Sequence, residues 1–413
     1  MTQNNNCWTV EKDDNNIVWL HFDTPDSAAN LLSQAAIREL DELIKQFERD
    51  IPQAVIFVSD KPDSFIFGAD IKEFTALTEK QQALAFLQNG HELMNRIESL
   101  NCPTVSMVHG ICFGGGTELS LACDYFIASD DKKTKIGLPE IKLGIHPGYG
   151  GTARSIERCG PVAAMGIMLT GRALSARAAN KIRLIDEAVP LRQLKAAATH
   201  YALTAPSRKK LPLLVRLADN PLLRPLVASQ MRKQVKARAK PEHYPAPYTL
   251  IRLWQRYAGD KKLMLQKEAS AVAELATTET AKNLVRVFFL QEGLKSQGKQ
   301  TTFDVEHVHV IGGGIMGGDI ASWCAIQGYS VTVQDQSPER LAQTIKRAQY
   351  SFKKKFKRDR RAIRDANDRL TADHRGVGVH RADIVIEAIF EDVEVKRELY
   401  RALEPKMKPG AVL

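Results

Sequence analysis

The chain has 413 residues, 44% hydrophobic and 26% charged, so its composition is that of a globular protein larger than one hydrophobic core usually serves. Its start is polar, without the apolar core of a signal peptide, and no apolar run approaches the roughly 20 residues of a membrane span. We therefore expect a cytoplasmic protein of two or three domains, without a transmembrane segment.

Basic residues are concentrated in two stretches. The formal net charge is +10, yet residues 208–240 hold ten Lys or Arg against one acid, and residues 351–369 hold nine against three. Neither stretch carries a basic nucleic-acid-binding motif with interleaved aromatic residues. We interpret both as solvated helix faces and expect no nucleic-acid partner, although a phosphate-bearing small molecule is compatible with this charge.

The six cysteines are scattered, without CxxC pairs and without histidines at metal-ligand spacing. A chain of this size does not need disulfide staples. We expect buried reduced thiols and no metal site.

Strand and helix patterns alternate through residues 1–190. Runs rich in β-branched, aromatic or aliphatic residues predict strands at 16–22, 53–59 and 103–110. Apolar residues at helical spacing predict a helix over 37–50, and "TELSLACD", after a glycine turn, predicts another. This alternation predicts an α/β domain over residues 1–190.

Two further segments follow this domain. Residues 191–300 lose the strand patterns and consist of helical patterns broken by proline, which predicts a helical connector. Residues 301–413 return to α/β patterns, with strands predicted at 305–311 and 329–335. The chain ends in "KPGAVL", where another strand is expected to open, so we interpret the second α/β domain as truncated.

Glycine-rich turns and two glutamates stand out in the first domain. They lie in "FIFGADI" (65–71), "GICFGGGTEL" (110–119), "GLPEIKLGIHPGYGGT" (137–152) and "LTGRALSARAA" (169–179). Glycine lets backbone N–H groups approach a ligand, and a helix N-terminus offers unpaired donors, so two such amides aimed at one point would hold a developing oxyanion. Glu118 and Glu140 follow two of these turns and are the candidate proton-transfer groups.

These segments resemble the enoyl-CoA hydratase/isomerase (crotonase) family, and more closely the hydratase part of multifunctional fatty-acid oxidation α-subunits, through "GGGxE", "GxPExxxGxxPGxGG" and "GAD". The resemblance implies a ββα-superhelix fold, a coenzyme A thioester substrate, and a thioester oxygen held by the amides of Ala69 and Gly115. It also implies that Glu118 and Glu140 handle water and proton. The expected activity is hydration of 2-trans-enoyl-CoA to 3-hydroxyacyl-CoA, with 3-enoyl to 2-enoyl isomerisation, in fatty-acid β-oxidation.

Four residues near these motifs need separate interpretation. Asp70 fits N-capping of the following helix at least as well as catalysis. His146 stands where the family usually has an apolar residue, and we interpret it as a satisfied or exposed side chain. Phe67 and Tyr149 are larger than the residues usual in the family, so we expect them to narrow or reshape the acyl pocket.

A second glycine turn opens the last domain. "HVIGGGIMGGDIA" places Gly312, Gly314 and Gly317 in GxGxxG spacing between a strand and a helix, and Asp335 closes the next strand. This context predicts a Rossmann domain in which a pyrophosphate approaches the helix N-terminus and the carboxylate binds ribose hydroxyls. An acid at this position favours NAD over NADP.

The same domain resembles the NAD-binding part of 3-hydroxyacyl-CoA dehydrogenase, including "ADIVIEAIFEDVEVKRELY" (382–400). The resemblance implies that Ala388, Glu391 and Lys396 lie near the ribose and nicotinamide of the cofactor. Without it, Glu391 and Lys396 fit exposed helix residues equally well.

Two features of this domain depart from the dehydrogenase family. Asp319 replaces a small residue in the first helical turn and is expected to weaken pyrophosphate binding unless its side chain points away. The family's catalytic serine, histidine, glutamate and asparagine follow the point that corresponds to Leu413. We therefore expect hydratase activity without dehydrogenase turnover.

Two other hypotheses stay open. Another crotonase-type reaction, such as thioester hydrolysis or isomerisation alone, fits the same motifs. A non-catalytic acyl-CoA-binding or NAD-binding subunit that docks a thiolase belongs to a different class of function. The resemblance implies a thiolase β-subunit as partner or a homo-oligomer, and the sequence does not decide between them.

Overall fold

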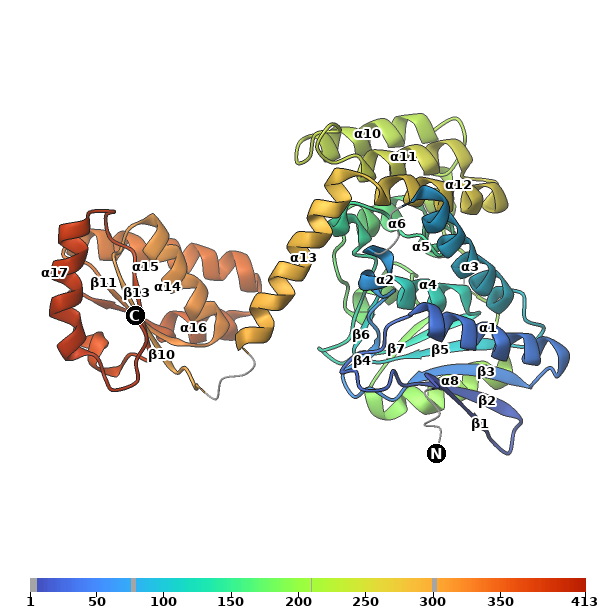
Figure 1. Cartoon of the computed structure of the whole chain (residues 1–413), viewed down its shortest axis with the longest axis horizontal. Helices are drawn as coiled ribbons and strands as arrows, with labels where there is room; N and C mark the ends of the chain where they lie inside the picture. The colour runs from blue at the N-terminus through green and yellow to red at the C-terminus, as the bar shows by residue number, and fades with distance from the viewer. Residues whose placement is uncertain (1–5, 76–78, 209, 299–302) are drawn as a thin grey trace. The chain divides into compact units, whose positions relative to one another are not determined.

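The computed structural model describes residues 6–75, 79–208, 210–298 and 303–413. The chain forms two compact units, residues 1–295 and residues 296–413, and each is described by itself (Figure 1). Among the described helices, none combines the length and the apolar character that crossing a bilayer requires.

Two sheets organise the first unit. The larger has the strand order β1-β2-β3-β5-β7-β9 and is parallel except for the antiparallel pair β1 and β2. The smaller has the order β4-β6-β8 and is parallel. The strands are β1 (Trp8–Lys12), β2 (Ile17–Phe22), β3 (Ala54–Ser59), β4 (Ser64–Ile66), β5 (Thr104–Val108), β6 (Ile111–Phe113), β7 (Tyr125–Ser129), β8 (Lys135–Gly137) and β9 (Glu187–Val189).

A strand-strand-helix unit repeats three times in this part of the chain. β3, β5 and β7 of the larger sheet are each followed by a strand of the smaller sheet and then by a long or short helix. These helices are α3 (Lys80–Glu98) after the short α2 (Ile71–Thr75), α4 (Gly115–Ala122), and α5 (Gly151–Cys159) after the 3₁₀ turn η1 (Glu140–Leu143). This repeat confirms the predicted ββα-superhelix. Within it, the glycine turns lie next to the smaller sheet, where a helix or a strand begins.

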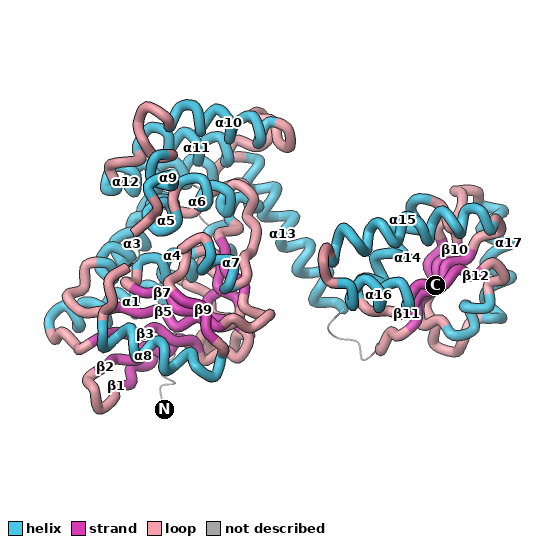
Figure 2. Tube along the Cα trace, turned by 180° about the vertical axis from the view of Figure 1, so that it is seen from behind, coloured by secondary structure: helices cyan, strands magenta, loops and turns pink. Residues whose placement is uncertain are grey.

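The larger sheet is covered on both faces, and Figure 2 shows α8 and α1 on opposite sides of it. One face packs against α8 (Leu194–Thr204), which buries Ala198 and Ala202 at helical spacing. The other face belongs to the main core, into which α1 (Gln34–Arg49) buries an apolar stripe that includes Leu40.

Helices after residue 191 pack onto the same unit. α12 (Lys261–Ala276) contacts α3 and α5, while α11 (Ala246–Tyr257) contacts α12 and α10 (Arg224–Lys236). The Trp254 indole of α11 is fully buried, and its N–H donates to Asp219 Oδ1 at 2.9 Å. These helices share the main core with the sheets and lie over α3 and α5 in Figure 1. The remaining elements are α6 (Pro161–Met168), α7 (Ala176–Lys181), η2 (Leu191–Gln193), α9 (Leu213–Leu217) and α13 (Glu279–Gly298).

The second unit is built on a four-stranded parallel sheet with the order β12-β11-β10-β13. Numbered within this unit the order is 3-2-1-4, the arrangement of a dinucleotide-binding fold, whose switch point lies between β10 and β13. The predicted Rossmann domain is therefore confirmed. Its elements are β10 (His307–Ile311), α14 (Ile315–Gln327), β11 (Ser330–Gln334), α15 (Pro338–Phe356), α16 (Arg360–Arg369), β12 (Leu370–Asp373), η3 (Val377–Arg381), β13 (Ile384–Glu387), α17 (Val393–Leu403) and η4 (Glu404–Lys406).

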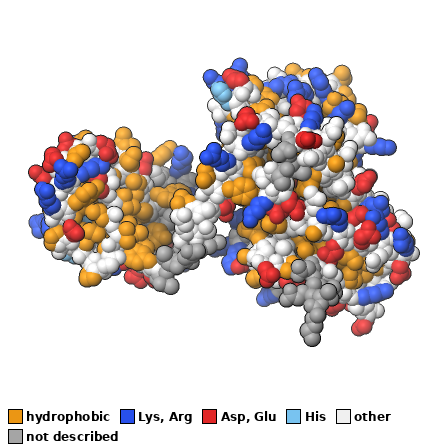
Figure 3. All heavy atoms as spheres, in the orientation of Figure 1, with side chains coloured by type: hydrophobic (Ala, Val, Ile, Leu, Met, Phe, Trp, Pro, Cys, Tyr) orange, Lys and Arg blue, Asp and Glu red, His pale blue; other side chains and the backbone are white. Residues whose placement is uncertain are grey.

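The basic stretches lie on exposed helix faces. Lys233, Lys236 and Arg238 at the end of α10 are exposed, as are Lys353 and Lys354 of α15. Figure 3 shows Lys and Arg side chains gathered over the α10 region at the top of the view.

Helix starts differ in a way that matters for function. Ser33 before α1, Asp260 before α12 and Ser337 before α15 each accept a backbone N–H of the first turn. α4 and α14 instead begin after Gly114 and Gly314, without a side-chain cap. A ligand can therefore approach the first amides of these two helices.

Candidate active site and nucleotide site

The glycine turn before α4 is tightly enclosed. Gly114 has a φ of 52°, which residues with side chains rarely adopt, and a Cβ on Gly116 would lie 2.6 Å from the Cβ and the carbonyl oxygen of Ile66. The Thr117 hydroxyl donates to the Cys112 carbonyl oxygen at 2.8 Å. Glycine is therefore required at both positions, and the start of α4 is held against the smaller sheet.

Two backbone amides lie side by side at this turn. A Cβ on Gly115 would lie 3.5 Å from the Ala69 nitrogen, and one on Gly68 would lie 3.7 Å from the Gly115 nitrogen. The Leu32 amide donates to the Gly68 carbonyl at 2.8 Å and so orients the next peptide. Among the residues that the structure describes, neither the Ala69 nor the Gly115 N–H has a hydrogen-bond partner. Both are free to donate to a ligand.

These amides border a cavity of about 110 Å³ with mainly apolar walls. Its carboxylates are Glu118 of α4 and Glu140 of η1. Val272 of α12 and Val285 of α13 also line it, so the helical layer completes the wall. The structure thus brings together Ala69, Gly115, Glu118 and Glu140, the four residues that the family resemblance implies.

Glu118 is a buried carboxylate held by backbone amides. Only 3% of Glu118 is exposed. Its Oε1 accepts the N–H groups of Tyr149 (2.7 Å) and Gly151 (2.8 Å). Burial, followed by the nearby charge of Glu268, raises the pKa of Glu118 to about 7, and the two amides oppose that rise. Glu118 is thus poised to gain or lose a proton near neutral pH.

Glu140 faces the same cavity without a partner of its own. Both carboxylate oxygens are buried, and neither has a hydrogen-bond partner among the described residues. A Cβ on Gly114 would lie 3.3 Å from Glu140 Oε1, so this carboxyl adjoins the glycine turn. Burial, and then the charge of Glu118, raises the pKa of Glu140 well above its ordinary value, so the neutral acid is favoured.

Two further buried groups belong to this region, and the sequence analysis did not identify them. Glu268 of α12 is 0% exposed, and His91 of α3 is 7% exposed. His91 Nε2 lies 3.3 Å from Glu268 Oε1. Helical periodicity could have identified Glu268 from the sequence, because Glu268 shares a buried helix face with Met264 and Val272. An ionisable residue on an apolar face indicates a functional or networked group.

The four residues set apart in the sequence have distinct environments. Asp70 Oδ1 accepts the Lys72 N–H at 2.8 Å and so caps α2. His146 is completely buried, which rules out the exposed alternative; its Nδ1 lies 2.9 Å from the Pro147 carbonyl oxygen. Phe67 lines the cavity and is 41% exposed.

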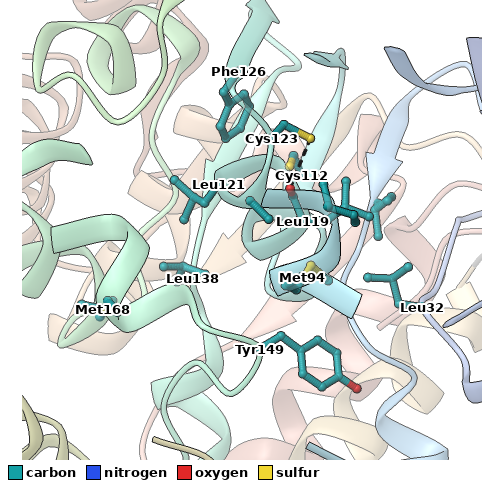
Figure 4. Close-up of a cluster of buried hydrophobic side chains, with 14 of the residues drawn as sticks. Leu32, Met94, Cys112, Leu119, Leu121, Cys123, Phe126, Leu138, Tyr149 and Met168 are labelled. Atoms are coloured by element: carbon teal, nitrogen blue, oxygen red, sulfur yellow. Dashed lines mark hydrogen bonds between the residues drawn. The ribbon is translucent and has the colours of Figure 1, made fainter. Parts of the chain in front are cut away.

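The Tyr149 ring packs against α3. Its ring centroid lies 6.0 Å from that of Phe86, and a Cβ on Gly90 of α3 would lie 2.3 Å from its ring carbons. Figure 4 shows the Tyr149 ring at the edge of a buried cluster that includes Met94 and Leu119. The hydroxyl is buried and has no partner among the described residues. The ring therefore occupies one wall of the cavity.

The glycine loop of the second unit has room for a cofactor. Gly312 has a φ of 109°, and a Cβ there would lie 2.4 Å from the Ala388 carbonyl oxygen. A Cβ on Gly317 would lie 1.9 Å from the Gly312 carbonyl oxygen, so strand and helix meet closely. A Cβ on Gly314 would meet nothing within 4 Å. The backbone at Gly314 thus faces open space at the start of α14, where a pyrophosphate fits.

Asp335 follows β11 beside this loop. Its Oδ2 accepts the Gly313 N–H at 2.8 Å and its Oδ1 accepts the Ser337 N–H at 2.9 Å, while 9% of the residue is exposed. The amide of Ala388 donates to the Ile311 carbonyl at 2.8 Å, which places Ala388 at the end of β13 next to the glycine loop. Both predicted residues lie at the edge of the sheet where the loop opens.

Glu391 and Lys396 form an ion pair in which Glu391 is exposed and Lys396 is partly buried. Lys396 Nζ lies 2.9 Å from Glu391 Oε1 and 3.0 Å from Glu387 Oε2. These carboxylates raise the pKa of Lys396. Asp319 is exposed on α14. The structure therefore brings Glu391 and Lys396 together near the end of β13, and their contact with cofactor stays a prediction.

Two family models match the chain. Residues 12–246 match the enoyl-CoA hydratase/isomerase family, and residues 307–413 match the NAD-binding domain of 3-hydroxyacyl-CoA dehydrogenase. The chain belongs to the enoyl-CoA hydratase/isomerase family. Its second unit is the NAD-binding domain of the 3-hydroxyacyl-CoA dehydrogenase type, so the protein combines a crotonase-type enzyme with a dinucleotide-binding domain. The predicted NAD cofactor and coenzyme A thioester chemistry are confirmed at the level of these families.

The whole chain also matches a curated relative. It is 35% identical over 420 residues to the fatty acid oxidation complex subunit alpha of Aliivibrio fischeri, a match that covers 98% of this chain. The chain spans 60% of the length of that relative.

Two solved structures are similar to part of this chain. Human mitochondrial delta3-delta2-enoyl-CoA isomerase matches 70% of this chain and 99% of its own, with a TM-score of 0.51 and 22% identity. An enoyl-CoA hydratase from Bacillus anthracis matches 62% of this chain and 93% of its own, with a TM-score of 0.45 and 26% identity. The first likeness shows the crotonase fold.

Proposed function

We propose that the first unit hydrates 2-trans-enoyl-CoA to 3-hydroxyacyl-CoA, a step of fatty-acid β-oxidation. The observation that carries the proposal is the meeting of two unpaired amides, Ala69 and Gly115, with two buried carboxyls, Glu118 and Glu140, in one cavity. Hydration needs both pairs, because negative charge builds on the thioester oxygen while water adds at C3 and a proton adds at C2.

The amide pair is suited to the developing charge. The cavity walls are mainly apolar, which strengthens each N–H donor's interaction with the charge, and the backbone donors are already fixed in place before the reaction. Loss of one such donor typically lowers the rate by about 10²–10³. This differential binding of the enolate-like oxygen would account for much of the catalysis.

Different surroundings favour different roles for the two carboxyls. Glu118 accepts two amide N–H groups, which stabilise its ionised form, whereas Glu140 has no hydrogen-bond partner among the described residues and favours its neutral form. We assign Glu118 as the general base that activates water and Glu140 as the acid that protonates C2. Because the two carboxyls interact, their titration belongs to the pair.

The same two groups could also move a proton between C4 and C2 of the acyl chain. Isomerisation of 3-enoyl-CoA to 2-enoyl-CoA needs an oxyanion site and one shuttling carboxyl, and both lie in this cavity. We therefore propose isomerisation as an accompanying activity. Thioester hydrolysis requires a nucleophile at the carbonyl carbon instead, and crotonyl-CoA hydration separates it from the leading proposal.

A crotonyl-CoA hydration assay tests the proposed reaction. Glu140→Gln is expected to lower kcat by about 10²–10⁴, because the amide cannot donate a proton as the acid does. Glu92→Gln, an exposed residue of α3, is the matched control and should leave kcat unchanged. An inactive unmutated protein that still binds acyl-CoA would instead support the non-catalytic subunit.

The second unit is proposed to bind NAD through Gly312, Gly314, Gly317 and Asp335. The matched family model covers the NAD-binding domain alone. We therefore expect calorimetry to detect NAD binding by this chain. A calorimetric titration without detectable binding would contradict that expectation.

A partner subunit is a further part of the proposal. The relative from Aliivibrio fischeri is named as a subunit of a complex, and a thiolase would consume the oxidised product of the dehydrogenase step. Co-purification with a thiolase at several salt concentrations separates specific docking from attraction to the basic helices, since screening weakens only the latter strongly. Oligomers of this chain alone would support the homo-oligomer.

A further inference from the structure

The loop that holds Glu118 lies between two buried carboxylates. Glu118 accepts the N–H groups of Tyr149 and Gly151, whereas Glu268 accepts those of Gly150 at 2.6 Å and Thr152 at 3.1 Å. Four successive amides thus alternate between the two side chains. Each carboxylate satisfies donors at the start of α5 that have no helical partner.

Glu268 reaches this loop from a distant part of the chain. It lies on α12, 116 residues beyond Thr152, and it is completely buried. Its Oε2 also accepts the Thr152 hydroxyl. A buried carboxylate without such partners would be strongly destabilising, so the loop and Glu268 depend on each other.

Charged and titratable groups surround Glu268 from every packed element. His91 of α3 lies 3.3 Å from Oε1. Glu118, Glu140 and the buried His146 lie on the cavity side and interact with it electrostatically. Arg154 of α5 donates to the Tyr149 carbonyl at 3.2 Å, but its charge is paired with Glu98 at 2.9 Å. His91 is therefore the basic side chain that faces Glu268 directly.

We propose that Glu268 and His91 form a positioning pair in which Glu268 holds the loop from Tyr149 to Thr152 around Glu118, while His91 faces Glu268 from α3 and opposes its charge. The inference rests on the proposed hydratase function for its kinetic meaning. It adds two residues, His91 of α3 and Glu268 of α12, that do not line the cavity.

The signs of the two effects are opposite. The charge of Glu268 raises the pKa of Glu118, whereas protonated His91 lowers it. Removing the carboxylate therefore lets Glu118 ionise at lower pH, and removing the imidazole delays its ionisation to higher pH. Nearby charges of this kind shift a pKa by about one unit or more.

The pH profile of crotonyl-CoA hydration tests the pair. We expect kcat of the unmutated protein to rise through an acidic limb near pH 7, the value to which the pKa of Glu118 is raised. Glu268→Gln keeps an acceptor for the loop and should move this limb down by about one pH unit. His91→Asn should move it up. Glu274→Gln, an exposed position on the same helix, is the control and should leave the limb in place.

A titration that needs no turnover separates the inference from the proposed function. The ¹³C NMR signal of the Glu118 carboxyl, in protein labelled at glutamate and assigned by its loss in Glu118→Gln, should shift its midpoint in the same opposite directions. Unmoved midpoints in two folded variants would overturn the positioning pair even if hydration occurs. Shifted midpoints in a protein without hydratase activity would overturn the proposed function and support the pair.

Discussion

Both units of the protein start a helix from a glycine turn after a parallel strand, but they use it differently. At α4 the turn is enclosed, its amides border a cavity of about 110 Å³, and Glu118 lies in the first turn of the helix. At α14 the turn is open at Gly314, and Asp319, expected in the first helical turn, is instead the fifth residue of the helix and is exposed. One turn suits a charge that exists only during reaction, whereas the other suits the permanent charge of a bound pyrophosphate.

The comparison predicts that a substitution near the α4 turn impairs hydration alone, whereas one near the α14 turn impairs NAD binding alone. Glu118→Gln should lower kcat of crotonyl-CoA hydration by about 10²–10⁴, because the proposed general base is lost, and should leave NAD binding unchanged. Asp335→Asn should weaken NAD binding about 10-fold, because a charge-assisted hydrogen bond is lost, and should leave hydration unchanged. Hydration kinetics and NAD calorimetry on both variants provide the measurement. A variant that impairs both assays equally would break the distinction.

Replacing a glycine by alanine in each turn should change the free energy of unfolding by different amounts. Gly116→Ala places a Cβ 2.6 Å from backbone and side-chain atoms of Ile66, so it should lower the free energy of unfolding by about 1–3 kcal/mol and disturb the amide of Gly115. Gly314→Ala meets nothing within 4 Å and has ordinary backbone angles, so it should change that free energy by less than about 0.5 kcal/mol. Urea unfolding of both variants measures the difference. Equal losses would show that the α14 turn is as enclosed as the α4 turn.

The smallest expected effect concerns the wall of the cavity beside α4. Tyr149→Ala removes a ring that packs between Phe86 and Gly90, so the ratio of kcat/KM for octenoyl-CoA to that for crotonyl-CoA should rise several-fold. Tyr149→Phe keeps the ring and should leave the ratio unchanged. An unchanged ratio in a folded Tyr149→Ala protein would mean that the acyl chain follows another path. Thermal unfolding shows whether each variant is folded.

Much of the fold was predictable because the signals are local. Strands expected at 16–22, 53–59 and 103–110 correspond to β2, β3 and β5, and the helix expected over 37–50 corresponds to α1. Periodicity of apolar residues and glycine turns act over a few positions, so they can be read along the chain. The exposed alternative for His146 was wrong, because a single polar residue in a loop carries no periodic signal of its burial.

The amino-acid sequence by itself determined the two classes of turn, the two carboxyls and the family to which they point, since each depends on residues a few positions apart. Only the tertiary structure decided what surrounds Glu118. Glu268 and His91 come from α12 and α3, and Tyr149 fits against Gly90, through contacts between segments distant along the chain. Burial and the charges of these neighbours set the pKa of Glu118, because electrostatic interactions depend on distance in space and on the removal of water.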